Sequence, residues 1–159
     1  MSKISPYRAL PIERRLSLVA FAIKSGREGR DQFIQRLVAR GGGFRPATLQ
    51  SWDPLRLARE VVRMKAESAS DERDLLQMLY VDLEPAIQTT FLDAAGVAHE
   101  AGKMDDALEP PYADEEAVKR GVAAVREKHG VDGEHYLETI ARYSRDGWPG
   151  IEAIVPKAD

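Results

Sequence analysis

Residues 53–67 read DPLRLAREVVRMKAE and carry the clearest signal for the fold. Asp53 is typical of a helix N-cap, and Pro54 fits the first helical position, where its missing N–H removes no hydrogen bond. At 100° per residue, the apolar side chains of this stretch cover one broad arc. Three arginines form a narrow stripe opposite that arc: Arg56, Arg59 and Arg63. The stretch therefore predicts an amphipathic helix over 53–67.

The chain on both sides of this stretch has the same helical character. Apolar residues recur at steps of three and four, and the alternation typical of strands is nearly absent. Pro85 predicts a kink or a restart, because proline removes a backbone donor and clashes with the preceding turn. We therefore expect an all-α protein, a compact bundle of five or six helices. The expected helices cover residues 11–25, 29–40, 53–67, 71 to about 96 or 102, 114–130 and 132–145.

The composition limits the classes of protein that remain. The 159 residues suffice for one helical domain without a disulfide or a metal. The absence of cysteine excludes a disulfide framework, a thiolate zinc site, an iron–sulfur cluster and a cysteine nucleophile. Residues 1–10 lack the features of a secretion signal, and the longest apolar run, residues 16–23, falls short of the roughly 20 residues that cross a bilayer. We expect a cytoplasmic protein with no membrane partner and no cofactor.

Charge is distributed unevenly along the chain. Residues 1–66 carry 14 lysines and arginines and 5 acidic residues, whereas residues 67–159 carry 9 and 21. The single domain is therefore expected to have a basic lobe, residues 1–67, and an acidic lobe, residues 68–159. A basic lobe attracts an anionic partner such as nucleic acid, but the two lobes could equally pack on each other or on a second copy.

One local pattern has some specificity for DNA binding. A helix-turn-helix needs a small residue, a turn glycine and three apolar anchors at set spacings. Those positions are occupied by Ala39, Gly43, Phe44, Leu49 and Trp52, and residues 46–52 resemble the start of the recognition helix in bacterial helix-turn-helix proteins. The resemblance covers residues 36–52 and implies DNA contacts by Arg45, Thr48, Gln50 and Ser51, with Arg56, Arg59 and Arg63 beside them. The alternative is an ordinary helix, a glycine linker and a capped helix.

Catalytic and metal-binding patterns are weaker. Asp82, Glu84 and Asp93 precede His99 and could form a metal cluster with it, with Asp93 and His99 as the principal ligands. The spacings of helical metalloproteases and di-iron bundles do not occur, and neither do the motifs of serine nucleophiles or dinucleotide binding. The sequence therefore favours a protein that is not an enzyme, and leaves a metal-dependent enzyme centred on His99 as a third alternative.

The favoured interpretation is a helical protein-interaction module that forms homo-oligomers. Its basis is the apolar C-terminal tail, which is too apolar to remain in water and must dock on the body or on a partner. The residues expected at the contact surface are Trp148 and Ile151 in that tail and Tyr112 in the preceding loop.

Overall fold

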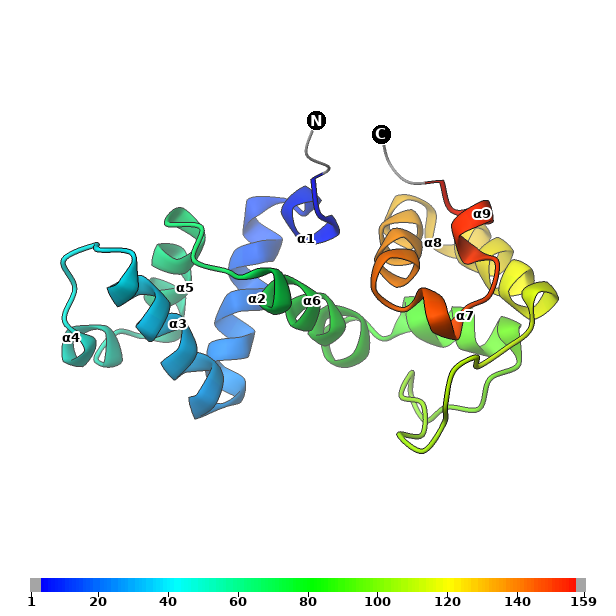
Figure 1. The fold of residues 1–159 in the computed structure, drawn as a ribbon, viewed down its shortest axis with the longest axis horizontal. Helices are drawn as coiled ribbons and strands as arrows, with labels where there is room; N and C mark the ends of the chain where they lie inside the picture. The colour runs from blue at the N-terminus through cyan, green and yellow to red at the C-terminus, as the bar shows by residue number, and fades with distance from the viewer. Residues whose placement is uncertain (1–3, 157–159) are drawn as a thin grey trace. The chain divides into compact units, whose positions relative to one another are not determined.

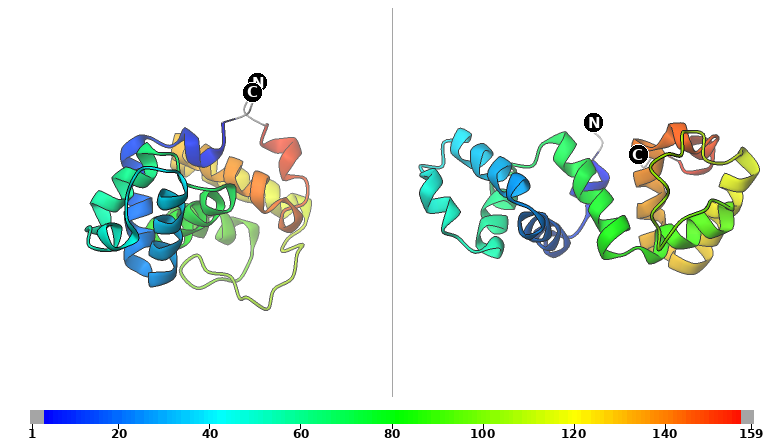
Figure 2. Two further views of the ribbon diagram at one scale, coloured as in Figure 1. Left: turned by 60° about the vertical axis from the view of Figure 1, so that its left-hand side comes forward. Right: turned by 90° about the horizontal axis from the view of Figure 1, so that it is seen from below.

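The structure, a computed structural model, describes residues 4–156 and confirms the all-α prediction: this part of the chain holds nine α-helices and no β-strand (Figure 1; Figure 2). The helices are α1 (Pro6–Ala9), α2 (Ile12–Ser25), α3 (Arg27–Ala39), α4 (Pro46–Gln50), α5 (Pro54–Arg63), α6 (Ala69–Met78), α7 (Ala86–Ala95), α8 (Glu115–Tyr143) and α9 (Ile151–Ile154). A π-helical turn, η1 (Leu79–Leu83), precedes α7, and a 3₁₀ turn, η2 (Arg145–Gly147), follows α8. None of the helices within residues 4–156 combines the length and apolarity needed to span a bilayer.

The described residues hold nine α-helices where five or six were expected, and one expected helix end differs while another agrees. The helix expected over 53–67 ends at Arg63, because Lys65 takes a left-handed conformation with φ of 51° that no helix can continue. α8 covers both helices expected over 114–145, but Gly130 inside it is not helical, with φ of 53° and ψ of −126°. Gly130 therefore divides α8 into two halves, as the sequence indicated.

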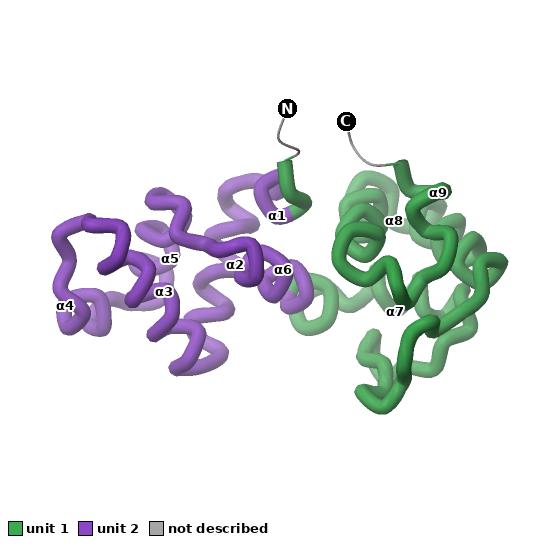
Figure 3. Tube along the Cα trace, in the orientation of Figure 1, with its two compact units in different colours: residues 1–6, 79–159 green, residues 7–78 purple. Residues whose placement is uncertain are grey.

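The chain divides into two compact units (Figure 3). Among the described residues, unit 2 consists of residues 7–78, and unit 1 consists of residues 4–6 and 79–156. The structural boundary between the units lies at residues 78–79, at the start of η1, whereas the sequence changes from basic to acidic at residues 66–67. The acidic start of α6 therefore belongs to the same unit as most of the basic residues.

In unit 2, α2 packs against α3, α5 and α6. The Asp53 side chain caps α5 and accepts hydrogen bonds from the N–H groups of Leu55 and Arg56, each at 3.1 Å. Ser68 and Asp71 cap α6 reciprocally, since each side chain accepts a hydrogen bond from the other residue's N–H. The ends of these helices are therefore fixed by local sequence.

A buried carboxylate holds the N-terminal segment of unit 2 onto the start of α6. Glu67 is 5% exposed and accepts a hydrogen bond from the Tyr7 hydroxyl at 2.8 Å. The Arg8 guanidinium lies 3.4 Å from the same carboxylate and 2.5 Å from that of Glu72. We call Tyr7, Arg8, Glu67 and Glu72 the Glu67 network. It neutralises part of the basic charge within the unit itself.

In unit 1, the central contact is between α7 and α8. Gly121 in α8 allows this close approach, because a Cβ atom there would lie 2.7 Å from the Phe91 ring of α7. Phe91 in turn touches two further rings edge to face, that of Trp148 at 4.8 Å between centroids and that of Tyr136 at 5.9 Å. The core of unit 1 is thus organised around aromatic contacts.

Candidate functional site

Unit 1 encloses a cavity of about 280 Å³ beside this aromatic core. Its walls come from α7, from the loop between α7 and α8, from the second half of α8 and from the turn η2 with the residue after it. Four aromatic side chains line it: Tyr112, Tyr136, Tyr143 and Trp148. The polar side chains among the lining residues are Gln88, Ser144 and Asp146.

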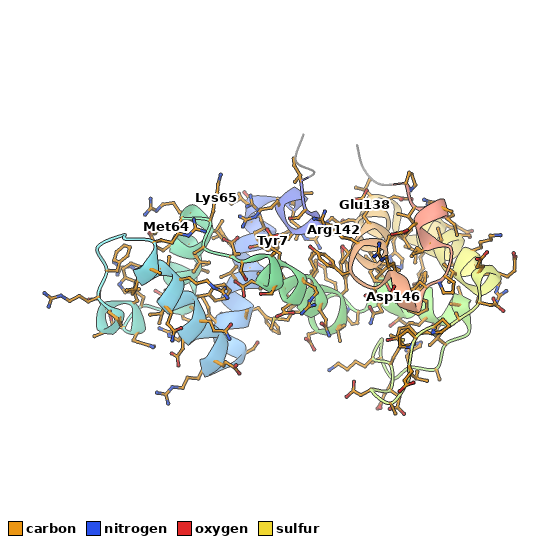
Figure 4. All side chains as sticks on the ribbon, viewed as in Figure 1. Tyr7, Met64, Lys65, Glu138, Arg142 and Asp146 are labelled. Atoms are coloured by element: carbon orange, nitrogen blue, oxygen red, sulfur yellow. The ribbon has the colours of Figure 1, made fainter. Side chains whose placement is uncertain are left out.

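The second half of α8 supplies one wall of the cavity. Tyr136, Ile140 and Tyr143 follow at steps of four and three residues and therefore share one helix face. α8 ends at Tyr143, and η2 begins two residues later and brings Asp146 to the cavity (Figure 4).

The opposite wall is held rigidly by Trp148 and its contacts. The Tyr112 N–H donates to the Gly147 carbonyl at 3.0 Å, which ties the loop before α8 to the turn after it. The Tyr112 and Trp148 rings lie 5.3 Å apart at 57°. Gly147 has no room for a side chain, because a Cβ atom there would collide with the Tyr112 ring. The cavity is therefore formed by packed side chains and does not depend on a ligand to shape it.

The hydroxyl of Tyr136 is the most informative polar group at the cavity. The Tyr136 side chain is 1% exposed, and no residue within 4–156 forms a hydrogen bond with its hydroxyl. Burial raises the pKa of this hydroxyl, and Tyr80 raises it further, so the group stays protonated and can donate. Buried polar groups in folded proteins nearly always have a partner.

Gln88 and Asp146 add oxygen acceptors to the lining of the cavity. The Gln88 amide donates to the Gly102 carbonyl at 2.5 Å, which leaves its own oxygen without a partner among the described residues. Asp146 is exposed, and its carboxylate lies 4.0 Å from the Arg145 guanidinium. The cavity thus combines apolar rings, one neutral hydroxyl and several oxygen acceptors.

The three residues expected at a contact surface all belong to unit 1. Trp148 and Ile151 are 3% and 1% exposed, and Tyr112 is half-buried. The tail therefore docks on its own unit, which is one of the two outcomes expected for it, and Phe91 packs edge to face against Trp148. Trp148 and Tyr112 instead line the cavity.

Two of the candidate DNA-reading side chains, those of Gln50 and Ser51, have internal partners. The Gln50 amide donates to Asp31 at 2.8 Å and accepts from Arg30 at 3.2 Å. The Ser51 hydroxyl donates to the Thr48 carbonyl at 2.6 Å, within its own turn. α4 itself has five residues, too few to extend along a major groove in the way a recognition helix does. Gln50 and Ser51 are thus engaged inside unit 2.

The neighbouring arginines differ in their surroundings. Arg45 and Arg59 are exposed and have no partner among the described residues. Arg56 lies over the Trp52 ring at 4.2 Å, and Arg63 pairs with Glu60. The apolar anchors behave as expected from the motif, since Leu49 is fully buried and the Phe44 and Trp52 rings meet edge to face at 5.1 Å.

His99 and Asp93 are brought together by the structure, at 2.5 Å between Nε2 and a carboxylate oxygen. The Gly102 N–H donates to His99 Nδ1 at 3.0 Å, so Nδ1 is an acceptor and Nε2 carries the proton that Asp93 accepts. Both ring nitrogens are used in closing the turn after α7. Within residues 4–156, His, Asp and Glu nowhere gather in a group of three or more that could hold a metal.

The sequence did not single out four of the residues that define the cavity: Gln88, Tyr136, Tyr143 and Asp146. Nothing local in the sequence marks Tyr136 or Tyr143 as bordering a cavity. Comparison with known proteins adds no guide, because no family model, curated protein or solved structure matches the chain.

Proposed function

We propose that this chain is a non-enzymatic helical binding module that takes one group of a partner into the aromatic cavity of unit 1. The observation that carries the proposal is Tyr136, which lines the cavity and whose hydroxyl has no partner among residues 4–156. A neutral hydroxyl in that position can donate a hydrogen bond to a bound group.

The chemistry of the cavity supports binding over catalysis. The raised pKa of Tyr136 keeps its hydroxyl neutral, which suits a hydrogen-bond donor and not a general base near pH 7. The other groups are rings and weakly basic oxygen acceptors. Rings and a few placed polar atoms are the usual composition of a recognition pocket.

The size of the cavity favours a single inserted group. At about 280 Å³ it lies just below the range of about 300–1,000 Å³ for ligand pockets. A protein partner, or a second copy of the chain, can supply such a group as one side chain. We therefore retain a protein partner as the favoured class and self-association as the alternative.

The test is a fragment screen followed by two-dimensional NMR on the full chain. The two tryptophans report separately, since Trp148 lines the cavity and Trp52 lies in unit 2. We expect fragments that shift the Trp148 indole signal and not that of Trp52, and weaker shifts for Tyr136→Phe, which removes only the hydroxyl. A screen without fragments that act in this way would contradict the proposal. Static light scattering on the same sample tests self-association.

A second candidate function, binding of a polyanion such as nucleic acid by unit 2, is supported by Arg45 and Arg59. Both are exposed and unpaired among the described residues, and exposed Lys65 follows at the end of α5 (Figure 4). Such a surface binds phosphates through charge without reading the sequence.

Fluorescence anisotropy of a labelled mixed-sequence duplex tests this second function. If it is correct, Arg45→Ala and Arg59→Ala each reduce the salt slope of binding by about 1. Lys119→Ala in unit 1 is the matched control and leaves the slope unchanged. No binding at low salt would rule this function out.

A further inference from the structure

We infer that the cavity of unit 1 selects an organic cation, an alkylammonium or guanidinium group carried by a free molecule or by a side chain of a protein partner. This inference rests on the proposed function, since it names the chemistry of the group that enters the cavity. Two features of the site carry it: the aromatic walls and the sign of the charges around them.

The walls present rings at an angle to one another. The Tyr112 and Trp148 rings are tilted by 57° at 5.3 Å between centroids, and Tyr143 adds a third ring from α8. The edge-to-face contact of Phe91, at 88°, fixes the orientation of Trp148. Rings gathered around a small space attract cations through the negative charge above their faces, and Trp and Tyr do so most strongly.

The chain already places a cation over one of these rings. The Arg142 guanidinium lies 5.7 Å from the centroid of Tyr143. Arg142 is exposed and is not among the residues that line the cavity. The Tyr143 ring thus already contacts one guanidinium of the chain itself.

The polar atoms of the cavity also favour a positive ligand. Among the described residues that line it, none is cationic, and the one ionisable carboxylate is that of Asp146. The unpaired Gln88 oxygen and the Ser144 hydroxyl add acceptors. Arg145, the nearest cation along the chain, is shared between Asp146 at 4.0 Å and Glu152 at 3.3 Å.

The segment of the chain that forms the cavity also carries a net negative charge. Residues 79–159 carry 8 lysines and arginines and 17 acidic residues. Such an excess raises the local concentration of cations and repels anions, an effect that salt weakens.

Choline and 3,3-dimethyl-1-butanol form the sharpest pair of probes, because they have the same shape and differ in the positive charge. We would titrate each into the full chain by calorimetry, with the Trp148 indole signal as an independent readout. The expected result is that choline binds about tenfold tighter than the alcohol, as a desolvated cation–π site requires.

Asp146→Asn tests the role of the carboxylate. Because Asp146 is exposed, we expect the variant to fold normally, and an unchanged indole spectrum without ligand checks this first. It should weaken choline several-fold and leave the alcohol unaffected. Asp106→Asn is the matched control, because it removes the same charge from an exposed site in the loop before Tyr112 that does not line the cavity. It should leave both affinities unchanged.

Glycine–serine peptides with one arginine or one trimethyllysine distinguish the source of the cation. Tighter binding of a peptide than of choline assigns the cation to a protein side chain, whereas tighter binding of choline assigns it to a free molecule. Either result supports a cation site.

Two further outcomes separate the inference from the function on which it rests. If the alcohol binds as tightly as choline and Asp146→Asn changes nothing, the cation inference is wrong and the binding function stands. If choline, the alcohol, the peptides and the fragments all leave the Trp148 signal unchanged, both are wrong.

Discussion

The two units of this protein stabilise their cores by different means. Unit 2 places the buried Glu67 network between its first residues and α6, whereas unit 1 surrounds Phe91 with other rings. A buried carboxylate must be matched by donors at short distances, so its partners are positioned tightly around it. Ring contacts have no such requirement, and the rings of unit 1 border a cavity. The aromatic unit is therefore the one whose core leaves the cavity described above.

Glu67→Ala should lower the unfolding free energy the most, and it should do so in unit 2. It leaves the Tyr7 hydroxyl and the Arg8 guanidinium without their buried partner, and loss of such a partner costs about 3–5 kcal/mol of unfolding free energy. Denaturation followed by fluorine NMR of 5-fluorotryptophan gives one signal per unit, Trp52 for unit 2 and Trp148 for unit 1.

We expect the Trp52 transition of Glu67→Ala to move to lower denaturant while that of Trp148 moves less. Glu67→Gln, which keeps an acceptor for Tyr7, should cost less than Glu67→Ala. Equal shifts of the Trp52 and Trp148 transitions would contradict the idea that the two units are stabilised separately, since the units would then unfold as one.

Gly121→Ala should have the next largest effect, in unit 1. The added methyl group would lie 2.7 Å from the Phe91 ring and displace it, at a cost of about 1–3 kcal/mol. Because Phe91 supports Trp148, the Trp148 signal should move in the folded state as well. Gly26→Ala is the matched control, since that position has extended backbone and open space around it. An unchanged Trp148 signal in Gly121→Ala would show that Phe91 does not position the cavity wall.

Alkaline pH should weaken both units through one tyrosine each. Burial raises the pKa of Tyr7 in unit 2, with Glu67 raising it further, and burial raises that of Tyr136 in unit 1. The folded state therefore holds these protons when the unfolded state releases them near pH 10. Stability is full below pH 10 and falls above it by up to about 1.4 kcal/mol per pH unit for each tyrosine.

Absorbance at 295 nm measures this directly. Tyr7 and Tyr136 should ionise only as the protein unfolds, and Tyr7→Phe and Tyr136→Phe should each remove one of the late steps. Ionisation of all tyrosines near pH 10 in the folded protein would contradict their burial.

The smallest effect should come from a matched pair of helix caps. Asp53 caps α5 in unit 2, and Asp114 caps α8 in unit 1 by accepting from the Ala117 N–H at 2.8 Å. Asp53→Ala and Asp114→Ala should each cost about 1 kcal/mol. Each should shift the fluorine signal of its own unit, and equal shifts of both signals would argue for a single cooperative structure.

The parts of the fold that depend on neighbouring residues were predicted from the sequence. Asp53, Asp114 and Ser68 marked helix starts, because capping joins residues two or three positions apart. Gly130 marked a break in the same local way, because glycine readily takes a backbone conformation that interrupts a helix. The left-handed Lys65 was not foreseen, because that conformation is rare outside glycine.

The cavity could not be predicted, because its walls are distant in the sequence. Tyr112 meets Trp148 across the whole of α8, and no spacing rule relates the two. The apolar tail was correctly expected to dock, but only the position of Phe91 shows where. In the same way, the pattern of residues 36–52 located the anchors Leu49 and Trp52 but not the internal partners of Gln50.

The break at Gly130 means that the two halves of α8 need not share one helical phase. The first half keeps its buried valines toward α7, and the second half sets the angle of Tyr136 and Tyr143 independently. One residue inserted beside Gly130 would rotate the second half by about 100° and carry both tyrosines out of the cavity together. An insertion or deletion at this joint would thus reshape the cavity during evolution without any substitution of the residues that line it.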